Sequence, residues 1–205
     1  MKIIYDKARA PNPRRVRIFL AEKGIEIPVE HIDLGALEHK SEAFAALNPM
    51  RRLPVLVLDD GTPIAESIAI CRYFEAVQPE PALFGRHPKQ IALIEMWQRR
   101  MELHLLAAIQ NVFRHSHPAM KAMEPVQIPE WSEVNRPRVT EALAVLDAQL
   151  GRHRFVAGDD YSVADITALV AVDFMKPVKI GVPPEMTNVL RWHAEVSTRP
   201  SAKAQ

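Results

Sequence analysis

The sequence predicts an α/β first half with a mixed four-stranded sheet, followed by an all-helical second half. Short apolar runs alternate with helical patterns over roughly the first 75 residues, whereas the rest of the chain has a helical period throughout. A proline-rich stretch, 78–85, separates the two halves and has little to pack. We therefore expect two domains, at 1–77 and 87–205.

The first half reads in order as strand, helix, strand, helix, hairpin and helix. Gly24 favours a helix end, Asn48-Pro49 stops a helix, and Asp60-Gly61 is a pair typical of tight turns. This order gives the sheet both parallel and antiparallel neighbours. The expected elements are a strand at Ile3–Tyr5, a helix ending at Gly24, a strand at Val29–Leu34, a helix at Ser41–Leu47, a hairpin over 53–65 and a helix from Glu66 to about Val77.

The second half has the apolar spacing of packed helices. We expect a long helix from His87 to about His115, a helix at Val134–Leu150 that Gly151 ends, and a last helix at about Glu185–Val196. The segment Val163–Phe174 is almost entirely apolar, which predicts a helix buried on most sides. Residues 119–131 contain prolines and are expected to form an irregular link.

Composition excludes several classes of protein. The 205 residues are 48% hydrophobic, enough for a sizeable core, and the formal net charge of +1 provides no general attraction for nucleic acid or an anionic membrane. Cys71 is the only cysteine, which excludes an internal disulfide and a thiolate-rich metal site, and we expect no metal. The charged start and the absence of an apolar run of about 20 residues predict a soluble, cytoplasmic protein.

Two dipeptides indicate a binding site. Pro54 after Leu53 cannot donate to a sheet, so it fits a strand start, a sheet edge or a cis turn. Glu66-Ser67 lies where a strand leads into a helix, and the pair is complementary to the ammonium and carboxylate of an amino acid; alternatively, Ser67 only caps its own helix. Because no Cys-x-x-Cys is present, sulfur chemistry would need a thiol from the ligand.

Four segments make the chain resemble a known family, the cytosolic glutathione transferases, and in particular their theta-like and nu-like bacterial members. The resemblance covers nearly the whole chain. It implies a thioredoxin-like N-terminal domain, a C-terminal helical bundle domain, glutathione as the co-substrate and a homodimer. The segments are EHKSEAF at 38–44, LNPMRRLPVL at 47–56, IAESIAI at 64–70 and SVADIT at 162–167, the last of which we interpret as a structural capping motif.

The resemblance also implies which residues contact the substrates. Glutathione would lie extended along the N-terminal domain, and a small hydrophobic electrophile with a polar or anionic group would face the long helix that begins the second half. The implied contacts are Glu66 and Ser67 for the γ-glutamyl end, the main chain of Leu53 before Pro54 for the cysteinyl unit, His39 and Arg52 for the glycyl carboxylate, and Arg100 and His104 for the electrophile.

The group that activates the thiol departs from the common pattern. In this family it lies between the first strand and the first helix, where alignment puts Ala10 in place of the serine or threonine of theta-like and nu-like relatives. Asn12 is the first alternative, and it also fits an N-cap before a proline. Tyr5 is the rival, and Arg9 and Arg14 would add a positive field.

Two functions therefore remain open. The first is a glutathione transferase, acting in detoxification, whose bound thiolate attacks an electrophile or a mixed disulfide. The second is a glutathione-binding scaffold without useful turnover that binds ligands or a protein partner. The glutathione-contact motifs favour binding in either case, while Ala10 keeps the non-catalytic alternative open.

Overall fold

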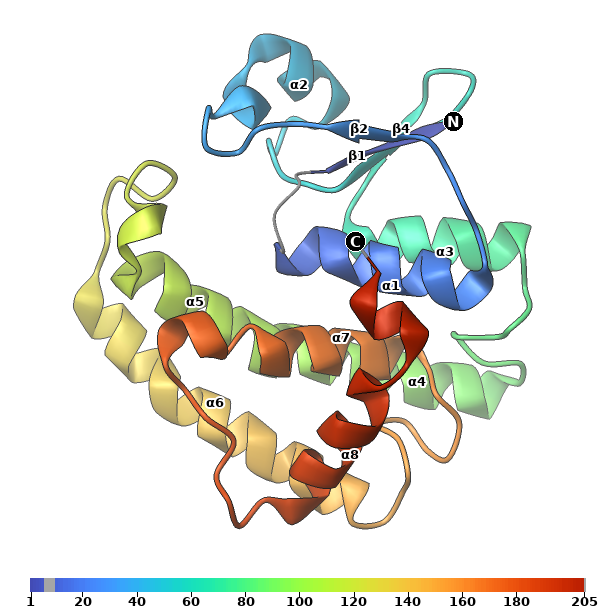
Figure 1. The fold of residues 1–205 in the computed structure, drawn as a ribbon, viewed down its shortest axis with the longest axis vertical. Coiled ribbons are helices and arrows are strands. Elements are labelled where there is room, and N and C mark those ends of the chain that lie inside the picture. Colours follow the sequence, from blue (N-terminus) through green and yellow to red (C-terminus); the bar gives the residue numbers. More distant parts are fainter. Residues whose placement is uncertain (6–9, 205) are drawn as a thin grey trace. The chain divides into compact units, whose positions relative to one another are not determined.

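The computed structural model describes residues 1–5 and 10–204, and it confirms the predicted mixed four-stranded sheet with helices followed by a helical region (Figure 1). The chain divides into two compact units. The first unit is Met1–Ala82 together with the short helix η5 (Pro200–Lys203), and the second is Leu83–Arg199. No helix in the described ranges is both long and apolar enough to cross a bilayer.

The sheet of the first unit has the order β2-β1-β3-β4. Strand β1 pairs in parallel with β2 and antiparallel with β3, and β3 pairs antiparallel with β4. The Asp60-Gly61 turn joins β3 to β4, with Gly61 at φ 85°. The strands are β1 (Lys2–Tyr5), β2 (Val29–His31), β3 (Val55–Val57) and β4 (Pro63–Ala65).

Three α-helices complete this unit. Helices α1 (Pro11–Lys23) and α3 (Ser67–Val77) lie side by side against one face of the sheet (Figure 1). Helix α2 (Glu42–Leu47) begins at Ser41, whose hydroxyl accepts a 3.2 Å hydrogen bond from the Phe44 N–H, and it follows the short helix η1 (Glu38–Lys40). Helix α1 ends at Gly24 in the left-handed region, as the glycine predicted.

The proline-rich stretch after α3 is anchored, although the sequence suggested little packing there. Lys23, whose side chain is fully buried, donates to the carbonyls of Gln78, Pro79 and Pro81 at 2.8, 3.1 and 2.7 Å. Its ammonium also lies 2.5 Å from the Glu75 carboxylate. A buried ammonium needs several acceptors, and the carbonyls that the prolines leave exposed supply them.

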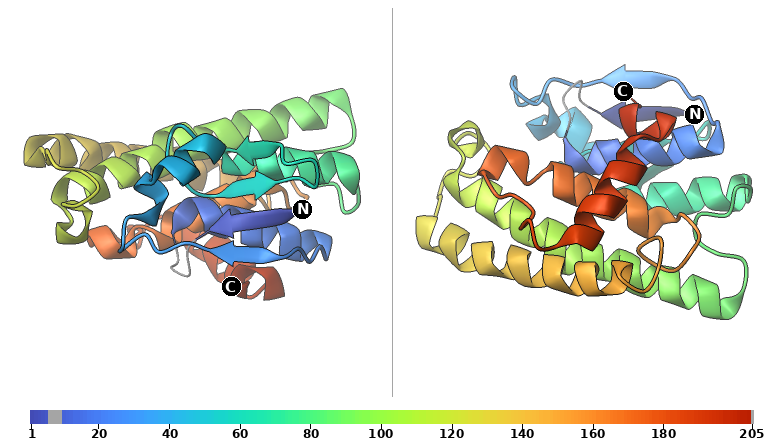
Figure 2. Two further views of the ribbon diagram at one scale, coloured as in Figure 1. Left: turned by 90° about the horizontal axis from the view of Figure 1, so that it is seen from above. Right: turned by 60° about the horizontal axis from the view of Figure 1, so that its bottom comes forward.

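The second unit consists of helices, and Figure 2 shows the longest two running side by side. The predicted long helix runs without a break through α4 (Pro88–Arg100), η2 (Met101–Leu106) and α5 (Ala107–Ser116). Its middle segment, η2, has π-helical geometry. Helix α7 is buried from its first residue to its tenth, as its apolar sequence predicted. The elements are α4 (Pro88–Arg100), η2 (Met101–Leu106), α5 (Ala107–Ser116), α6 (Pro129–Leu150), α7 (Val163–Asp173) and α8 (Thr187–Ser197).

The start of α6 corrects a sequence expectation. The helix was expected to begin at Val134, but it begins at Pro129 and continues through Pro137. A proline suits the first position of a helix because its ring fixes a helical φ and its missing N–H would have no partner there. The proline at 129 is therefore a start signal and not part of the irregular link.

The SVADIT motif is a buried hydrogen-bond centre at the start of α7. The Asp165 carboxylate accepts from the Ser162 N–H at 3.0 Å, the Val156 N–H at 2.9 Å and the Trp192 indole N–H at 2.9 Å. Burial raises the pKa of Asp165 to about 6, although these hydrogen bonds pull it down. The motif joins three segments of the helical unit, so its place in the structure is architectural.

Candidate glutathione-binding site

The register of the sheet gathers several motif residues at one end. Ile4 pairs with Val55 and Val55 pairs with Ala65, so the end of β1, the start of β3 and the end of β4 lie together. Tyr5, Leu53-Pro54 and Glu66 therefore meet at the same end of the sheet. Strand pairing thus brings together residues that lie far apart in the sequence.

Leu53 presents an unpaired piece of main chain at this end. The Leu53-Pro54 peptide bond is cis, and the residue precedes the ladder of β3. The Leu53 side chain is buried in a cluster with Ile4, Phe44 and Val55. Its N–H and C=O make no hydrogen bond to another described residue. Such an edge can pair with an extended peptide.

Asn48 fixes the turn that leads into Leu53. Its side chain is buried, donates to the Arg52 carbonyl at 2.8 Å and accepts from the Met50 N–H at 3.0 Å. Its own carbonyl accepts from the Arg51 N–H at 2.8 Å, and Arg51 has a left-handed φ of 52°. In the sequence, Asn48-Pro49 indicated only the end of a helix. The known tendency of asparagine to bond main chain two residues ahead was the missed signal.

The start of α3 leaves anion-binding donors unused. Glu66 is the N-cap residue with φ 69°, a left-handed conformation that costs a non-glycine residue roughly 1–3 kcal/mol. The alternative that Ser67 caps its own helix is wrong, since Ser67 is the first helical residue and no side chain caps α3. The N–H groups of Ser67, Ile68 and Ala69 donate to no other described residue. Together with the helix dipole they can hold a carboxylate.

His39 and Arg52 lie near each other in the first unit and could together bind a second carboxylate. His39 is 2% exposed, and its Nδ1 is buried without a hydrogen-bond partner in the described part of the chain. Burial lowers the pKa of His39, and the charges of Lys40 and Arg52 lower it further. The imidazole is therefore neutral at pH 7 and can donate one hydrogen bond to an anion.

The two neighbouring arginines differ in their partners. Arg51 forms an ion pair with Glu42 at 2.6 Å. Arg52 is exposed, and its guanidinium forms no ion pair or hydrogen bond with the residues the structure describes. Arg52 is thus available for an external carboxylate, in the pairing geometry that arginine favours.

The sequence suggested Asn12 as the N-cap of α1, and the structure corrects this prediction. The N-cap is Ala10, Pro11 and Pro13 flank Asn12 inside the first turn, and no side chain caps the helix. The Asn12 Oδ1 accepts from Arg15 Nη2 at 3.0 Å, and its amide nitrogen donates to no other described residue. Pro11 and Pro13 have no N–H, and the Asn12 N–H donates to none of the residues that the structure describes.

Tyr5 lies at the end of β1 and is 5% exposed. The Arg17 guanidinium lies 5.1 Å from the centre of its ring, and the ring meets His31 edge-on at 6.0 Å. Burial raises the pKa of Tyr5, although Arg17 opposes this. The phenol therefore stays neutral at physiological pH. Arg9, predicted to add a positive field, lies outside the described residues.

The predicted electrophile contacts belong to the second unit. Arg100 ends α4 with its guanidinium 4.7 Å from the centre of the Trp97 ring, and His104 is exposed on η2. Within residues 1–5 and 10–204, no group of three or more His, Cys, Asp or Glu side chains is arranged to hold a metal ion. Cys71 is fully buried, which raises the pKa of its thiol to about 12 and leaves it unreactive.

Comparison with known proteins agrees with this geometry. Residues 10–77 match the family described as "Glutathione S-transferase, N-terminal domain", and residues 100–200 match "Glutathione S-transferase, C-terminal domain". The chain is 39% identical over 204 residues to glutathione S-transferase 2 of Saccharomyces cerevisiae, covering 98% of this chain and 88% of the yeast protein.

Solved structures show the same likeness. The crystal structure of a glutathione S-transferase domain-containing protein from Marinobacter aquaeolei superposes with a TM-score of 0.94 at 39% identity, covering 98% of this chain and 99% of that one. Gtt2 from Saccharomyces cerevisiae superposes with a TM-score of 0.94 at 37% identity, covering 99% of each chain.

Proposed function

This chain belongs to the glutathione S-transferase family, and from that premise we propose that it binds glutathione along its first unit and stabilises the thiolate for attack on a hydrophobic electrophile or a mixed disulfide. The observation that carries the proposal is the set of unused main-chain donors at Leu53 and at the start of α3. Their number and position suit an extended tripeptide with a carboxylate at each end.

Each part of glutathione has a chemically matched contact in the proposal. The γ-glutamyl carboxylate binds the Ser67 hydroxyl and the N–H groups of α3, and the exposed Glu66 carboxylate accepts from the γ-glutamyl ammonium. The cysteinyl unit pairs with the Leu53 main chain. The glycyl carboxylate takes its positive partner from Arg52 and a hydrogen bond from neutral His39.

Activation of the thiol is assigned to Asn12. A free thiol has a pKa near 8.5, and lowering it by about two units requires roughly 2.7 kcal/mol of preferential thiolate stabilisation. The main-chain N–H and the side-chain amide of Asn12 donate to none of residues 1–5 and 10–204, and both groups favour a thiolate. Tyr5 is the alternative donor, and Ala10 supplies no hydroxyl.

The proposal also covers the contacts of the electrophile, the oligomeric state and the cellular compartment. Arg100 and His104 are the proposed contacts for an electrophile that carries a polar or anionic group. The protein is proposed to be a homodimer of the cytoplasm that serves in detoxification. Chromatography with light scattering measures the homodimer directly, and a monomer at assay concentration would contradict it.

Ala10 favours a second function, that of a glutathione-binding scaffold without turnover. Calorimetry with glutathione, followed by assays with a chlorodinitrobenzene-type electrophile and a small disulfide, separates the two. Turnover of either substrate supports the transferase. Clear binding with both reactions at background supports the scaffold, and no heat at millimolar glutathione refutes both.

The neighbouring arginines provide a matched control for the binding site. We expect Arg52→Gln to weaken glutathione binding by roughly tenfold, because it removes a charge-assisted contact to the glycyl carboxylate. Arg51→Gln removes the same charge one residue away, where the guanidinium is paired with Glu42, and should leave the affinity within about twofold. Equal effects would show that only the general positive field matters.

A further inference from the structure

The first turn of α1 holds the backbone of Asn12 rigid but leaves its side chain to be oriented. Pro11 and Pro13 lie on either side of Asn12, and each ring fixes the φ angle of its own residue. No side chain caps the helix, so the Asn12 amide is not engaged with the helix N–H groups. Whether Asn12 can stabilise a thiolate therefore depends on which way its amide is turned.

The two ends of an asparagine amide have opposite effects on a thiolate. The NH₂ end donates hydrogen bonds, whereas the oxygen accepts them and carries partial negative charge. The two ends have nearly the same shape, so packing by itself does not select one of them. An amide with its oxygen against the sulfur would oppose ionisation of the thiol. The proposed role of Asn12 therefore requires a partner that selects one orientation.

Arg15 is such a partner. It lies three positions after Asn12, on the same face of α1, and its Nη2 donates to the Asn12 Oδ1 at 3.0 Å. A guanidinium has donors and no acceptor, so it binds the oxygen end of the amide and not the nitrogen end. The Asn12 side-chain nitrogen donates to none of the residues that the structure describes. Arg15 therefore occupies the oxygen and leaves the donor end for a ligand.

The Arg15 side chain is buried, which strengthens this hydrogen bond. The residue is 4% exposed, and its charge also reaches the Cys71 thiol of α3. Burial raises the pKa of Cys71 to about 12, so that thiol is neutral and does not neutralise the guanidinium. A buried cation needs polar partners, of which the Asn12 oxygen is one, and its hydrogen bond to an amide is charge-assisted. Such a bond polarises the amide and makes its N–H groups better donors.

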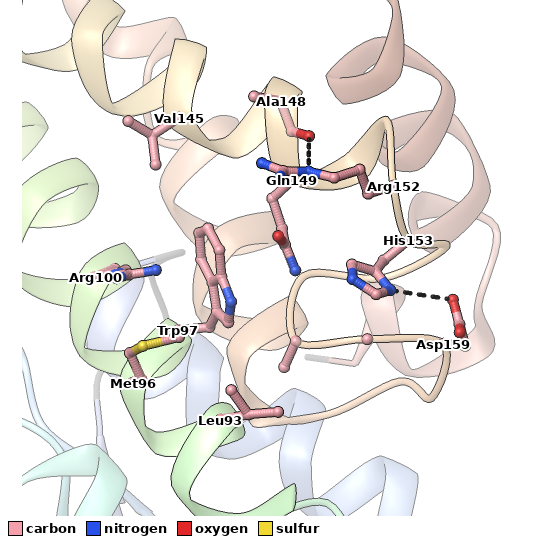
Figure 3. A pocket seen from close by; sticks show the side chains of 12 residues that line it. Leu93, Met96, Trp97, Arg100, Val145, Ala148, Gln149, Arg152, His153 and Asp159 are labelled. Carbon is pink, nitrogen blue, oxygen red and sulfur yellow. Dashed lines mark hydrogen bonds and ion pairs between the residues drawn. The ribbon is translucent and has the colours of Figure 1, made fainter.

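An arginine of the second unit shows the ordinary alternative. Figure 3 shows Arg152, which follows α6, with its Nε donating to the Ala148 carbonyl at 3.3 Å. That contact joins an exposed side chain to the main chain at a helix end. The contact between Arg15 and Asn12 differs because its cation is buried and because it ends on a side-chain amide whose other end can still donate.

We propose that Arg15 is a positioning residue for thiol activation. It holds the Asn12 amide with the NH₂ end toward the sulfur of bound glutathione and strengthens that donor, so that the thiol loses its proton to solvent more readily. The inference deepens the proposed function and rests on it, because Arg15 acts on glutathione through Asn12.

Arg17 offers a matched control on the same helix. It is 7% exposed, and its guanidinium lies 5.1 Å from the centre of the Tyr5 ring. The hydrogen bond to Asn12 comes from Arg15 and not from Arg17. Because Tyr5 is the alternative donor to the thiolate, each of these two buried arginines is next to one of the two candidates.

The test is a double-mutant cycle that is read out by the thiol pKa of bound glutathione, measured by thiolate absorbance in the ultraviolet. We expect Arg15→Met to raise this pKa by about half a unit to one unit, because the amide loses the group that orients and polarises it. In the Asn12→Ala background the same substitution should raise the pKa by less than about 0.3 unit, since Arg15 then has no amide to act through. Arg17→Met should shift the pKa by less than about 0.3 unit in either background.

A measurement on the unaltered protein does not depend on how well these variants fold. With nitrogen-15 label in arginine and asparagine, a pH titration of the glutathione complex should move the Asn12 amide and Arg15 guanidinium resonances together with the thiolate absorbance. The Arg17 resonance should not follow the thiolate. S-methylglutathione, which has no thiol to ionise, should produce no movement with that midpoint. Circular dichroism and urea unfolding establish which variants are folded.

Three results would overturn the inference while the proposed function stands. One is an unchanged thiol pKa in folded Arg15→Met, and another is the same rise in the presence and absence of the Asn12 amide, which would reduce Arg15 to a general positive field. The third is a rise in Arg17→Met but not in Arg15→Met, which would assign activation to Tyr5. If Arg15→Met does not fold, resonances of Arg15 that ignore the thiolate overturn the inference. Failure of the unaltered protein to bind glutathione would refute the proposed function and the inference together.

Discussion

The assignment of Asn12 makes a prediction that separates a chemical role from a structural one. Asn12→Ala removes the side-chain amide that is available to the thiolate and the Oδ1 that accepts from Arg15 at 3.0 Å. A hydrogen bond to a charged group contributes about 1.5 kcal/mol or more, so the pKa of bound glutathione should rise by roughly one unit. Since Asn12 is not the N-cap, α1 loses no cap in this variant.

Asn12→Asp distinguishes the two roles. Aspartate keeps an oxygen for Arg15 but replaces the amide with a negative charge beside the sulfur. The thiol pKa should therefore exceed that of Asn12→Ala by about one unit or more, because a like charge opposes thiolate formation. If Asn12 served only to hold Arg15, Asn12→Asp would resemble the wild type and Asn12→Ala alone would be impaired.

The measurement is the ultraviolet absorbance of the thiolate in the binary complex, titrated against pH, with calorimetry to follow affinity. We expect the order wild type, Asn12→Ala, Asn12→Asp in rising thiol pKa, with glutathione affinity changed by less than about threefold at a pH where the thiol is protonated. An unchanged pKa in both variants refutes the assignment. Tyr5→Phe then becomes the decisive variant, because the neutral Tyr5 phenol is the alternative donor proposed for the thiolate.

Three further predictions concern Ser67, His39 and Asp165. Ser67→Ala should weaken glutathione binding roughly tenfold, measured by calorimetry. The free energy of unfolding in urea should change by less than about 1 kcal/mol, because Ser67 does not cap α3. A large loss of stability would contradict this. Burial holds the pKa of His39 low and a bound carboxylate raises it, so S-methylglutathione, which has no thiol to titrate, should bind more tightly as the pH falls from 7.5 toward 5.5. His39→Gln should abolish that pH dependence, and its persistence would assign the effect elsewhere. Asp165→Asn should lower the free energy of unfolding by about 3 kcal/mol in urea, because two of the donors that meet its carboxylate lose their acceptor. Because the Asp165 pKa is raised to about 6 in the folded state, its contribution falls as pH rises from about 4 to 6, and the variant's deficit should be larger at pH 5 than at pH 8.

Local patterns in the sequence were sufficient for the architecture and for the chemical character of the site. Alternation, helical period and turn residues depend on neighbours a few positions away, so the mixed sheet, the buried helix α7 and the stop at Gly24 were predictable. Glu66-Ser67 and Leu53-Pro54 were recognisable for the same reason, since each places special residues next to a predicted element boundary.

Contacts between distant residues could not be predicted in this way. The resemblance singled out Arg52, but only the fold shows that Arg51 pairs with Glu42 and that Arg52 forms no ion pair with a described residue. The fold likewise buries His39, which lowers its pKa. Such differences depend on which side chains meet after the chain has folded, and no local pattern encodes that.

The sequence by itself determined the fold class, the boundaries of most elements and the residue types that can meet the two ends of glutathione, because these follow from short-range periodicity and from turn and helix-start preferences. The tertiary structure alone decided that Arg51 pairs with Glu42, that His39 is buried and that Lys23 anchors the proline-rich stretch after α3. Each of these depends on strand register and helix packing, which bring together groups that the sequence keeps apart.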